Sequence, residues 1–168
     1  MKSKPSDAQL LETYAGKGLL LDSNLLLLLI VGNYDRSQVG RYKRLTRFTP
    51  DDYDILVEIV ERFHHLYITP NTTTEVSNLA GAFSGNSRTA CFKEFAETVL
   101  KSEEIAVASA DAVRHVAFGK LGITDAAIFH VAGNPPLVLT TDYELAQRLD
   151  AEGLPVINFN HIRTVFWR

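Results

Sequence analysis

Four acidic residues occupy positions where predicted strands end or predicted helices begin. Asp22 and Asp142 each follow an apolar run that is typical of a buried strand, while Glu75 and Asp125 fall near the starts of predicted helices. In a parallel sheet the carboxyl ends of the strands share one edge, and the helices that follow those strands begin at that edge. We therefore expect the four carboxylates to lie close together.

Carboxylates gathered in this way have a definite chemistry. They repel one another, so some of them take up protons unless a cation neutralises the cluster. Hard divalent cations such as Mg²⁺ and Mn²⁺ prefer oxygen ligands. Such ions, bound beside a groove, lower the pKa of a water molecule and stabilise the attacking and leaving oxygens when a phosphodiester is cut. The four acids therefore favour a Mg²⁺ or Mn²⁺ site that acts on phosphate esters.

Three of the acids also have a simpler structural explanation. Glu75 is the fourth residue of Thr72–Glu75, which fits a capping box at a helix start. Asp125 would follow Thr124 as the cap, and an acid in the first helical turn interacts favourably with the helix dipole. Asp142 could itself cap the helix that follows it. The metal-site hypothesis therefore rests on the ordered set and not on any of these three alone.

Asp22 is the acid that is hardest to explain by capping. It lies inside Gly18–Gly32, a stretch that is otherwise almost wholly apolar. A buried carboxylate is costly unless a partner compensates it. Either Ser23 or Asn24 could cap the following helix, which leaves Asp22 without an evident local partner. We therefore predict that Asp22 is the least dispensable of the four acids.

Alternating strand and helix signals position these acids along the chain. Short apolar or β-branched runs predict strands, while helical spacing, capping residues and glycine stops predict helices. The predicted strands are 19–21, 66–69, 105–108, 137–140 and 155–159. The predicted helices are 25–31, 50–64, 72–83, 89–101, 110–118, 125–132 and 143–151. This alternation predicts an α/β fold with a mostly parallel central sheet that helices cover on both faces.

Length and composition indicate one globular domain. The chain has 168 residues, of which 46% are apolar and 22% charged, and we expect a single domain over 1–168 with a lead-in segment at 1–17. The net charge of −3 excludes a global nucleic-acid footprint. A single cysteine, Cys91, excludes an internal disulfide framework and a Cys-rich zinc site. The N-terminus lacks a signal-peptide pattern and the run 19–31 is too short and too polar to span a bilayer, so we expect a cytoplasmic protein without a membrane anchor.

A basic segment precedes the helix predicted over 50–64. Its cations could bind phosphates and its tyrosine could stack on a base. The alternative is a solvated surface segment, which is the usual role of a charge run. The candidate nucleic-acid contacts are Arg41, Tyr42, Lys43, Arg44 and Arg47.

Taken together, these motifs resemble the PIN domain nucleases, a family that includes the toxins of the VapBC type. The resemblance rests on Asp22-Ser23-Asn24 after the first strand, Glu75 on a following helix, Asp125 in the context Thr-Asp-Ala, and Thr140-Thr141-Asp142 after the fourth strand. The four motifs occur in the family's order and cover roughly residues 18–160. The resemblance implies a three-layer α/β/α sandwich and divalent-metal-dependent cleavage of RNA.

The resemblance also implies roles for individual residues and partners. Asp22, Glu75, Asp125 and Asp142 would bind Mg²⁺ or Mn²⁺ and form the catalytic site. Asn24 and either Thr140 or Thr141 would orient the carboxylates or a metal-bound water through hydrogen bonds. Toxins of this family often have a small antitoxin partner, and family members are frequently homodimers.

Two other functions stay open at this point. A PIN-like domain could bind RNA or a partner protein without catalysis. Alternatively, Asp22 could be the nucleophile of a phosphatase of the haloacid-dehalogenase type, although such enzymes carry a second Asp where Asn24 stands.

Overall fold

The computed structural model describes residues 4–166 and contains a five-stranded sheet in which every strand is parallel to its neighbours. The order across the sheet is β3-β2-β1-β4-β5. The strands are β1 (Leu19–Leu21), β2 (Leu66–Ile68), β3 (Glu103–Glu104), β4 (Leu137–Thr140) and β5 (Val156–Asn158). The predicted α/β class with a parallel central sheet is confirmed.

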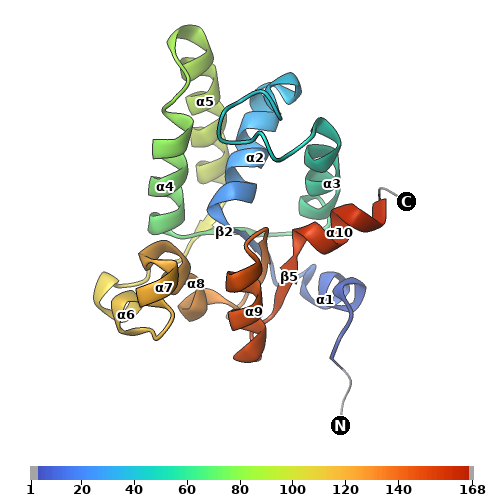
Figure 1. Cartoon of the computed structure of the whole chain (residues 1–168), viewed down its shortest axis with the longest axis vertical. Coiled ribbons are helices and arrows are strands. Elements are labelled where there is room, and N and C mark those ends of the chain that lie inside the picture. The colour runs from blue at the N-terminus through green and yellow to red at the C-terminus, as the bar shows by residue number, and fades with distance from the viewer. Residues whose placement is uncertain (1–3, 167–168) are drawn as a thin grey trace.

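Helices follow each strand and cover the sheet. They are α1 (Asp7–Tyr14), α2 (Ser23–Tyr34), α3 (Pro50–Val60), α4 (Pro70–Ala80), α5 (Gly85–Lys101), α6 (Ser109–Arg114), α7 (Phe118–Leu121), α8 (Ile123–Val131), α9 (Tyr143–Ala151) and α10 (Phe159–Phe166), with a short 3₁₀ helix at Arg36–Gln38. Figure 1 shows α2 to α5 on one side of the sheet and α6 to α9 on the other. The arrangement is a three-layer α/β/α sandwich.

The alternation of side chains along the strands builds a separate core on each face. Leu19 and Leu21 pack with buried residues of α2, α3, α4 and α5, whereas Leu20 packs with residues of α8 and α9. Successive residues of a strand point to opposite faces, so a fully apolar strand indicates a sheet covered on both sides. Helix α2 is itself enclosed by the sheet and three helices, which explains why Leu25–Val31 is apolar on every side.

Several element boundaries differ from the prediction, among them those of the third strand and of the helix that follows the second strand. The third strand is Glu103–Glu104 and not 105–108, because the pairing with Tyr67 and Ile68 of β2 sets the edge of the sheet. Charged residues suit such an exposed edge strand. Helix α4 begins at Pro70 and not at residue 72, because Thr69 is the N-cap and proline fits the first helical position.

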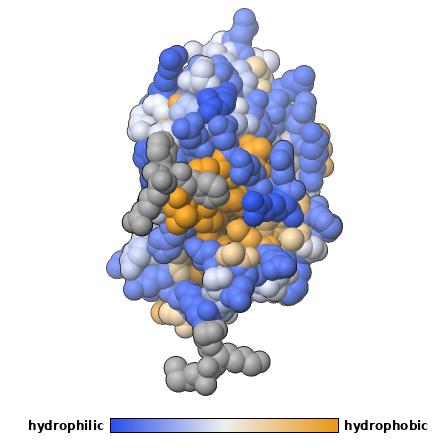
Figure 2. Space-filling model, turned by 90° about the vertical axis from the view of Figure 1, so that its right-hand side faces the viewer, coloured by the Kyte–Doolittle hydropathy of each residue, from blue (hydrophilic) through white to orange (hydrophobic). Residues whose placement is uncertain are grey.

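The C-terminal segment also differs from the prediction, which ended with a strand over 155–159. Phe159 is buried in the core and begins α10. Val165 of the same helix is 71% exposed, and the face on which α10 lies carries an apolar area (Figure 2). Within residues 4–166, no helix combines the length and the apolar character that crossing a membrane requires.

Replacing Gly32 with Ala should destabilise the protein, although alanine is the better helix former. A Cβ at Gly32 in α2 would lie 2.1 Å from a ring carbon of Tyr53 in α3. The propensity gain of up to about 1 kcal/mol is therefore outweighed by overpacking, which costs about 1–3 kcal/mol. Thermal unfolding of the purified variant measures the net effect.

Gly119→Ala is the matched control, because a Cβ at that position meets nothing within 4 Å. It should leave the melting temperature unchanged or raise it slightly. A Gly32→Ala protein as stable as the control would contradict the close packing of α2 against α3.

Candidate active site

The predicted acids gather at the point where the strand order reverses. β1 is flanked by β2 on one side and by β4 on the other, so the chain leaves β1 and β4 in opposite directions across the sheet. Asp22 directly follows β1, and Asp142 follows β4 by two residues. Ligands of open parallel sheets bind in the crevice at such a switch point, outside the carboxyl ends of the strands.

Asp22 is a buried carboxylate with a full set of hydrogen-bond donors. Its side chain is the N-cap of α2, where Oδ1 accepts from the Leu25 amide at 2.8 Å. Its Oδ2 accepts from the Thr140 hydroxyl and, at 2.8 Å, from the Thr141 amide. The expectation that Ser23 or Asn24 caps this helix, with Asp22 left without a local partner, is therefore wrong. Asp22 holds the start of α2 against the end of β4.

Two kinds of effect act on the pKa of Asp22 in opposite directions. Burial raises the pKa of this carboxyl above its usual range, because only 3% of the residue is exposed. The hydrogen bonds from Thr140, Leu25 and Thr141 and the positive charge of Arg47 act in the opposite direction and lower the pKa. Arg47 reaches the site by donating from Nη2 to Oγ1 of Thr141 at 2.7 Å.

Glu75 does not cap α4. The N-cap is Thr69, whose Oγ1 accepts from the Thr72 amide at 3.2 Å, so the predicted capping box at Thr72–Glu75 is wrong. The side chain of Glu75 lies one turn further along the helix and accepts a hydrogen bond from the Ser23 hydroxyl at 3.0 Å. Capping therefore does not account for an acid at position 75. The contact of Glu75 with the start of α2 is what the structure shows instead.

Ser23 is a site residue that sequence reasoning missed. It was considered only as a possible cap, but it is the first residue of α2, directly after Asp22. The sequence does carry a signal for Ser23, because its hydroxyl is next to an acid at a strand end and so lies at the same edge of the sheet. Recognising its partner required knowledge of how α2 and α4 pack.

Asp142 is the N-cap of α9, as predicted. Its Oδ1 accepts from the amides of Glu144 at 2.8 Å and Leu145 at 3.0 Å. The Asp142 amide donates to Oγ1 of Thr140 at 2.9 Å, and the same hydroxyl donates to Asp22. Thr140 thus links the acids that follow β1 and β4.

Asp125 brings the four acids into one electrostatic group. It lies in the first turn of α8, whose N-cap position is Gly122 and not the predicted Thr124. Burial, followed by the negative charges of Asp22, Asp142 and Glu75, raises the pKa of Asp125 to about 7. The three other carboxylates are therefore near enough to act on Asp125.

The donors suit a hard cation in their chemistry. All four are carboxylates, which hard divalent cations prefer. The pKa of Asp125 is raised first by burial and then by the negative charges of the other three. Across residues 4–166, however, no three His, Cys, Asp or Glu side chains are grouped closely enough to count as a formed metal site. The carboxylates would have to draw together around an ion, which their mutual repulsion opposes when no cation is bound.

The remaining predicted residues divide between the site and the surface. Asn24 lies in the first turn of α2, and no hydrogen bond of the described residues joins its side chain to the four acids. The predicted base-stacking role of Tyr42 is contradicted, because the residue is only 7% exposed, its ring stacks on Phe83 and its hydroxyl donates to the Leu79 carbonyl. The neighbouring cations Arg41, Lys43 and Arg44 are exposed.

The segment that carries Arg47 is anchored by the C-terminal helix. Arg163 of α10 donates to the carbonyl of Arg47 at 3.2 Å and to Oδ2 of the buried Asp52 at 3.1 Å. Phe48, also buried, lies beneath the guanidinium groups of both arginines. These contacts fix the backbone from which Arg47 extends to Thr141.

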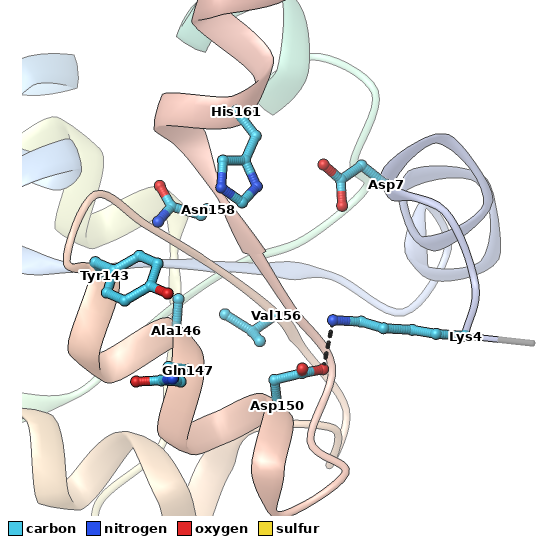
Figure 3. Close-up of a pocket in the computed structure, with 9 residues that line it drawn as sticks. All are labelled: Lys4, Asp7, Tyr143, Ala146, Gln147, Asp150, Val156, Asn158 and His161. Carbon is cyan, nitrogen blue, oxygen red and sulfur yellow. Dashed lines mark ion pairs between the residues drawn. The ribbon is translucent and has the colours of Figure 1, made fainter.

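A separate cavity of about 290 Å³ lies between α1, α9, β5 and α10 (Figure 3). Tyr143, Asn158 and His161 line it, and an ion pair of 2.7 Å between Lys4 and Asp150 spans its other end. None of the four clustered acids lines this cavity. The chemistry of the carboxylates therefore belongs to the switch point and not to this cavity.

Fold and site together define an α/β protein with a carboxylate cluster at the switch point of a parallel sheet. The chain matches no model of a known protein family, and no curated protein matches it. The resemblance to PIN domain nucleases therefore stays a prediction that rests on the ordered motifs and on the positions of their residues.

Asp125→Asn should stabilise the protein above about pH 7 and have little effect below about pH 4. In the unfolded chain the carboxyl has its ordinary pKa of 3.8, whereas in the folded protein it keeps its proton up to about pH 7. Between these values the folded state binds the extra proton, so its free energy of unfolding falls as the pH rises, by roughly 4 kcal/mol in total. Asparagine does not titrate, so the variant does not lose this stability as the pH rises. Urea unfolding at several pH values measures the growing difference in free energy of unfolding between the variant and the unchanged protein.

Glu58→Gln is the control, because Glu58 is an exposed residue of α3. The free energy of unfolding of Glu58→Gln should differ from that of the unchanged protein by about the same amount at pH 4 and at pH 7. A pH-independent effect of Asp125→Asn would contradict the raised pKa of Asp125.

Proposed function

We propose that the protein is a divalent-metal-dependent ribonuclease, similar to the PIN domain nucleases, that hydrolyses phosphodiester bonds of RNA. The observation that carries this proposal is the placement of four carboxylates at the switch point, where burial and then the negative charges of the other three raise the pKa of Asp125 to about 7. Such a cluster weakens the fold, so its presence favours a functional explanation.

The carboxylates Asp22, Glu75, Asp125 and Asp142 would hold Mg²⁺ or Mn²⁺. Bound there, the ion would supply an activated water and neutralise charge on the reacting phosphate. Asp125 would have to lose its proton to hold the ion, so binding would be coupled to pH near neutrality.

Neighbouring groups orient these carboxylates. The Thr140 hydroxyl and the Thr141 amide fix one oxygen of Asp22, and the Ser23 hydroxyl fixes Glu75. The amides of α9 hold one oxygen of Asp142. Side chains that are held in this way lose little rotamer freedom when they bind a ligand.

An Asp-nucleophile phosphatase is disfavoured by the surroundings of Asp22. A nucleophilic oxygen must reach a phosphorus atom, but Asp22 is 3% exposed and both of its oxygens accept hydrogen bonds. A PIN-like domain that binds RNA without catalysis is compatible with the fold, and the cleavage experiment below separates the two. A small antitoxin partner, a homodimer and a cytoplasmic location remain predictions from the resemblance and the composition.

RNA cleavage in the presence of Mg²⁺ or Mn²⁺ should fall about 100-fold or more in Asp125→Asn and in Asp142→Asn, since loss of a ligand costs at least as much as loss of its supporting groups. These positions test the site more cleanly than Asp22, whose loss would also release α2 from β4. The measurement is single-turnover cleavage of a labelled RNA at several metal concentrations. The proposal would be contradicted if Asp125→Asn and Asp142→Asn cleaved RNA as fast as the exposed control Glu58→Gln.

Metal binding should be visible without catalysis. An ion that binds the folded state at 100 times its dissociation constant stabilises it by about 2.7 kcal/mol. Adding Mg²⁺ or Mn²⁺ should therefore raise the melting temperature of the unchanged protein, and raise it less in Asp125→Asn. A uniform response, with Asp125→Asn and Glu58→Gln shifted alike, would assign the effect to sites outside the cluster.

A further inference from the structure

A groove of about 460 Å³ lies between α4, α8 and the start of α6. Glu75, one of the four acids, forms part of its wall, and so does Thr124, the residue before Asp125. The groove therefore borders the carboxylate site at Glu75, unlike the cavity beside β5.

The groove is lined by polar side chains without partners. Five uncharged polar side chains line the groove, and within residues 4–166 none of them forms a side-chain hydrogen bond, whereas Thr73 of α4 donates to the carbonyls of Thr69 and Pro70 at the start of that helix. Thr74, Asn78 and Ser109 are exposed to solvent, so their hydrogen-bonding groups can be reached by a ligand that enters the groove. The five are Asn71, Thr74, Asn78, Ser109 and Thr124.

The remaining lining residues define what the groove can accept. Leu79, Val107 and Ile123 supply apolar surface, and no Lys or Arg lines the groove. A phosphate would find no counter-charge there and would face the carboxylate of Glu75. An uncharged group with hydrogen-bonding edges and apolar faces fits better, and a nucleobase has this combination.

The groove and Arg47 lie on opposite sides of Asp22. Helix α4 follows β2, whereas Thr141, which Arg47 contacts, follows β4, and β1 with Asp22 lies between these strands. A guanidinium recognises phosphate oxygens. The edge of the sheet thus presents a cation, then the carboxylates, then an uncharged polar groove.

We propose that the groove between α4 and α8 binds an unpaired base of single-stranded RNA, next to the phosphodiester that lies over the carboxylates. This inference rests on the proposed function and adds a base-binding subsite to it. Amides of Asn71 and Asn78 can each donate and accept, so they can pair with the edge of a base. The backbone phosphate on the other side is bound by Arg47.

The test is binding of a labelled single-stranded oligoribonucleotide, followed by fluorescence anisotropy in EDTA so that no cleavage occurs. A second oligonucleotide of equal length carries abasic residues throughout, which keeps the phosphates and removes the bases. The double variant Asn71→Ala, Asn78→Ala should bind the RNA about tenfold more weakly but bind the abasic strand as the unchanged protein does. Asn86→Ala, an exposed asparagine in α5, is the matched control.

Salt dependence separates base contacts from phosphate contacts. Plotting log affinity against log salt concentration should give the same slope for the double variant and for the unchanged protein. Arg47→Ala should reduce the slope by about 0.7, as expected for one phosphate contact to a single strand. Its loss of affinity should be the same for both oligonucleotides.

The proposal is overturned if the double variant binds RNA like Asn86→Ala, or if it loses affinity for the RNA and the abasic strand equally. It is also overturned if the unchanged protein binds neither strand. Failure of the proposed function has a different signature, since base-dependent binding would persist while Mg²⁺ and Mn²⁺ produce no cleavage of the same RNA.

Discussion

The structure depends on the buried carboxylate of Asp22 and the three donors that satisfy it. One oxygen accepts from the Leu25 amide and the other from the Thr140 hydroxyl and the Thr141 amide. These bonds join the first strand, the most deeply buried helix and the fourth strand at the point where the sheet changes direction. A carboxylate without such donors would be costly at this depth, and its removal would leave the donors unsatisfied. Asp22, the acid in an apolar stretch, therefore connects these three elements of the fold.

Helix capping and site chemistry are compatible roles at this edge of the sheet. Asp22 caps α2, and Asp142 caps α9 with one oxygen. Capping restricts the rotamer of a carboxylate and so positions it for a ligand, because a held side chain loses little freedom on binding. Glu75 is the opposite case, since it caps nothing and is oriented by Ser23 instead. An acid at a helix start is thus no argument against a function for the same residue.

Electrostatic balance connects the site to the rest of the fold. Burial, followed by the negative charges of Asp22, Asp142 and Glu75, raises the pKa of Asp125. Arg47 supplies the positive charge that acts on Asp22, and it is held by a chain of contacts through Arg163 and the buried Asp52 to the C-terminal helix. The long connection before α3 and the end of the chain therefore both shape the charge at the switch point.

Sequence alone determined the alternation of strands and helices, the parallel sheet, and the positions of Asp22 and Asp142 at strand ends, because apolar runs and capping signals are local. Tertiary structure decided the partners: Ser23 with Glu75, 52 residues away, and Arg47 with Thr141, 94 residues away. It also buried Tyr42 against a carbonyl 37 residues away, although its neighbours are charged. The third strand lay at 103–104 because its register is set by β2 and not by its own residues. Contacts over such separations depend on how helices pack, and no local pattern records them.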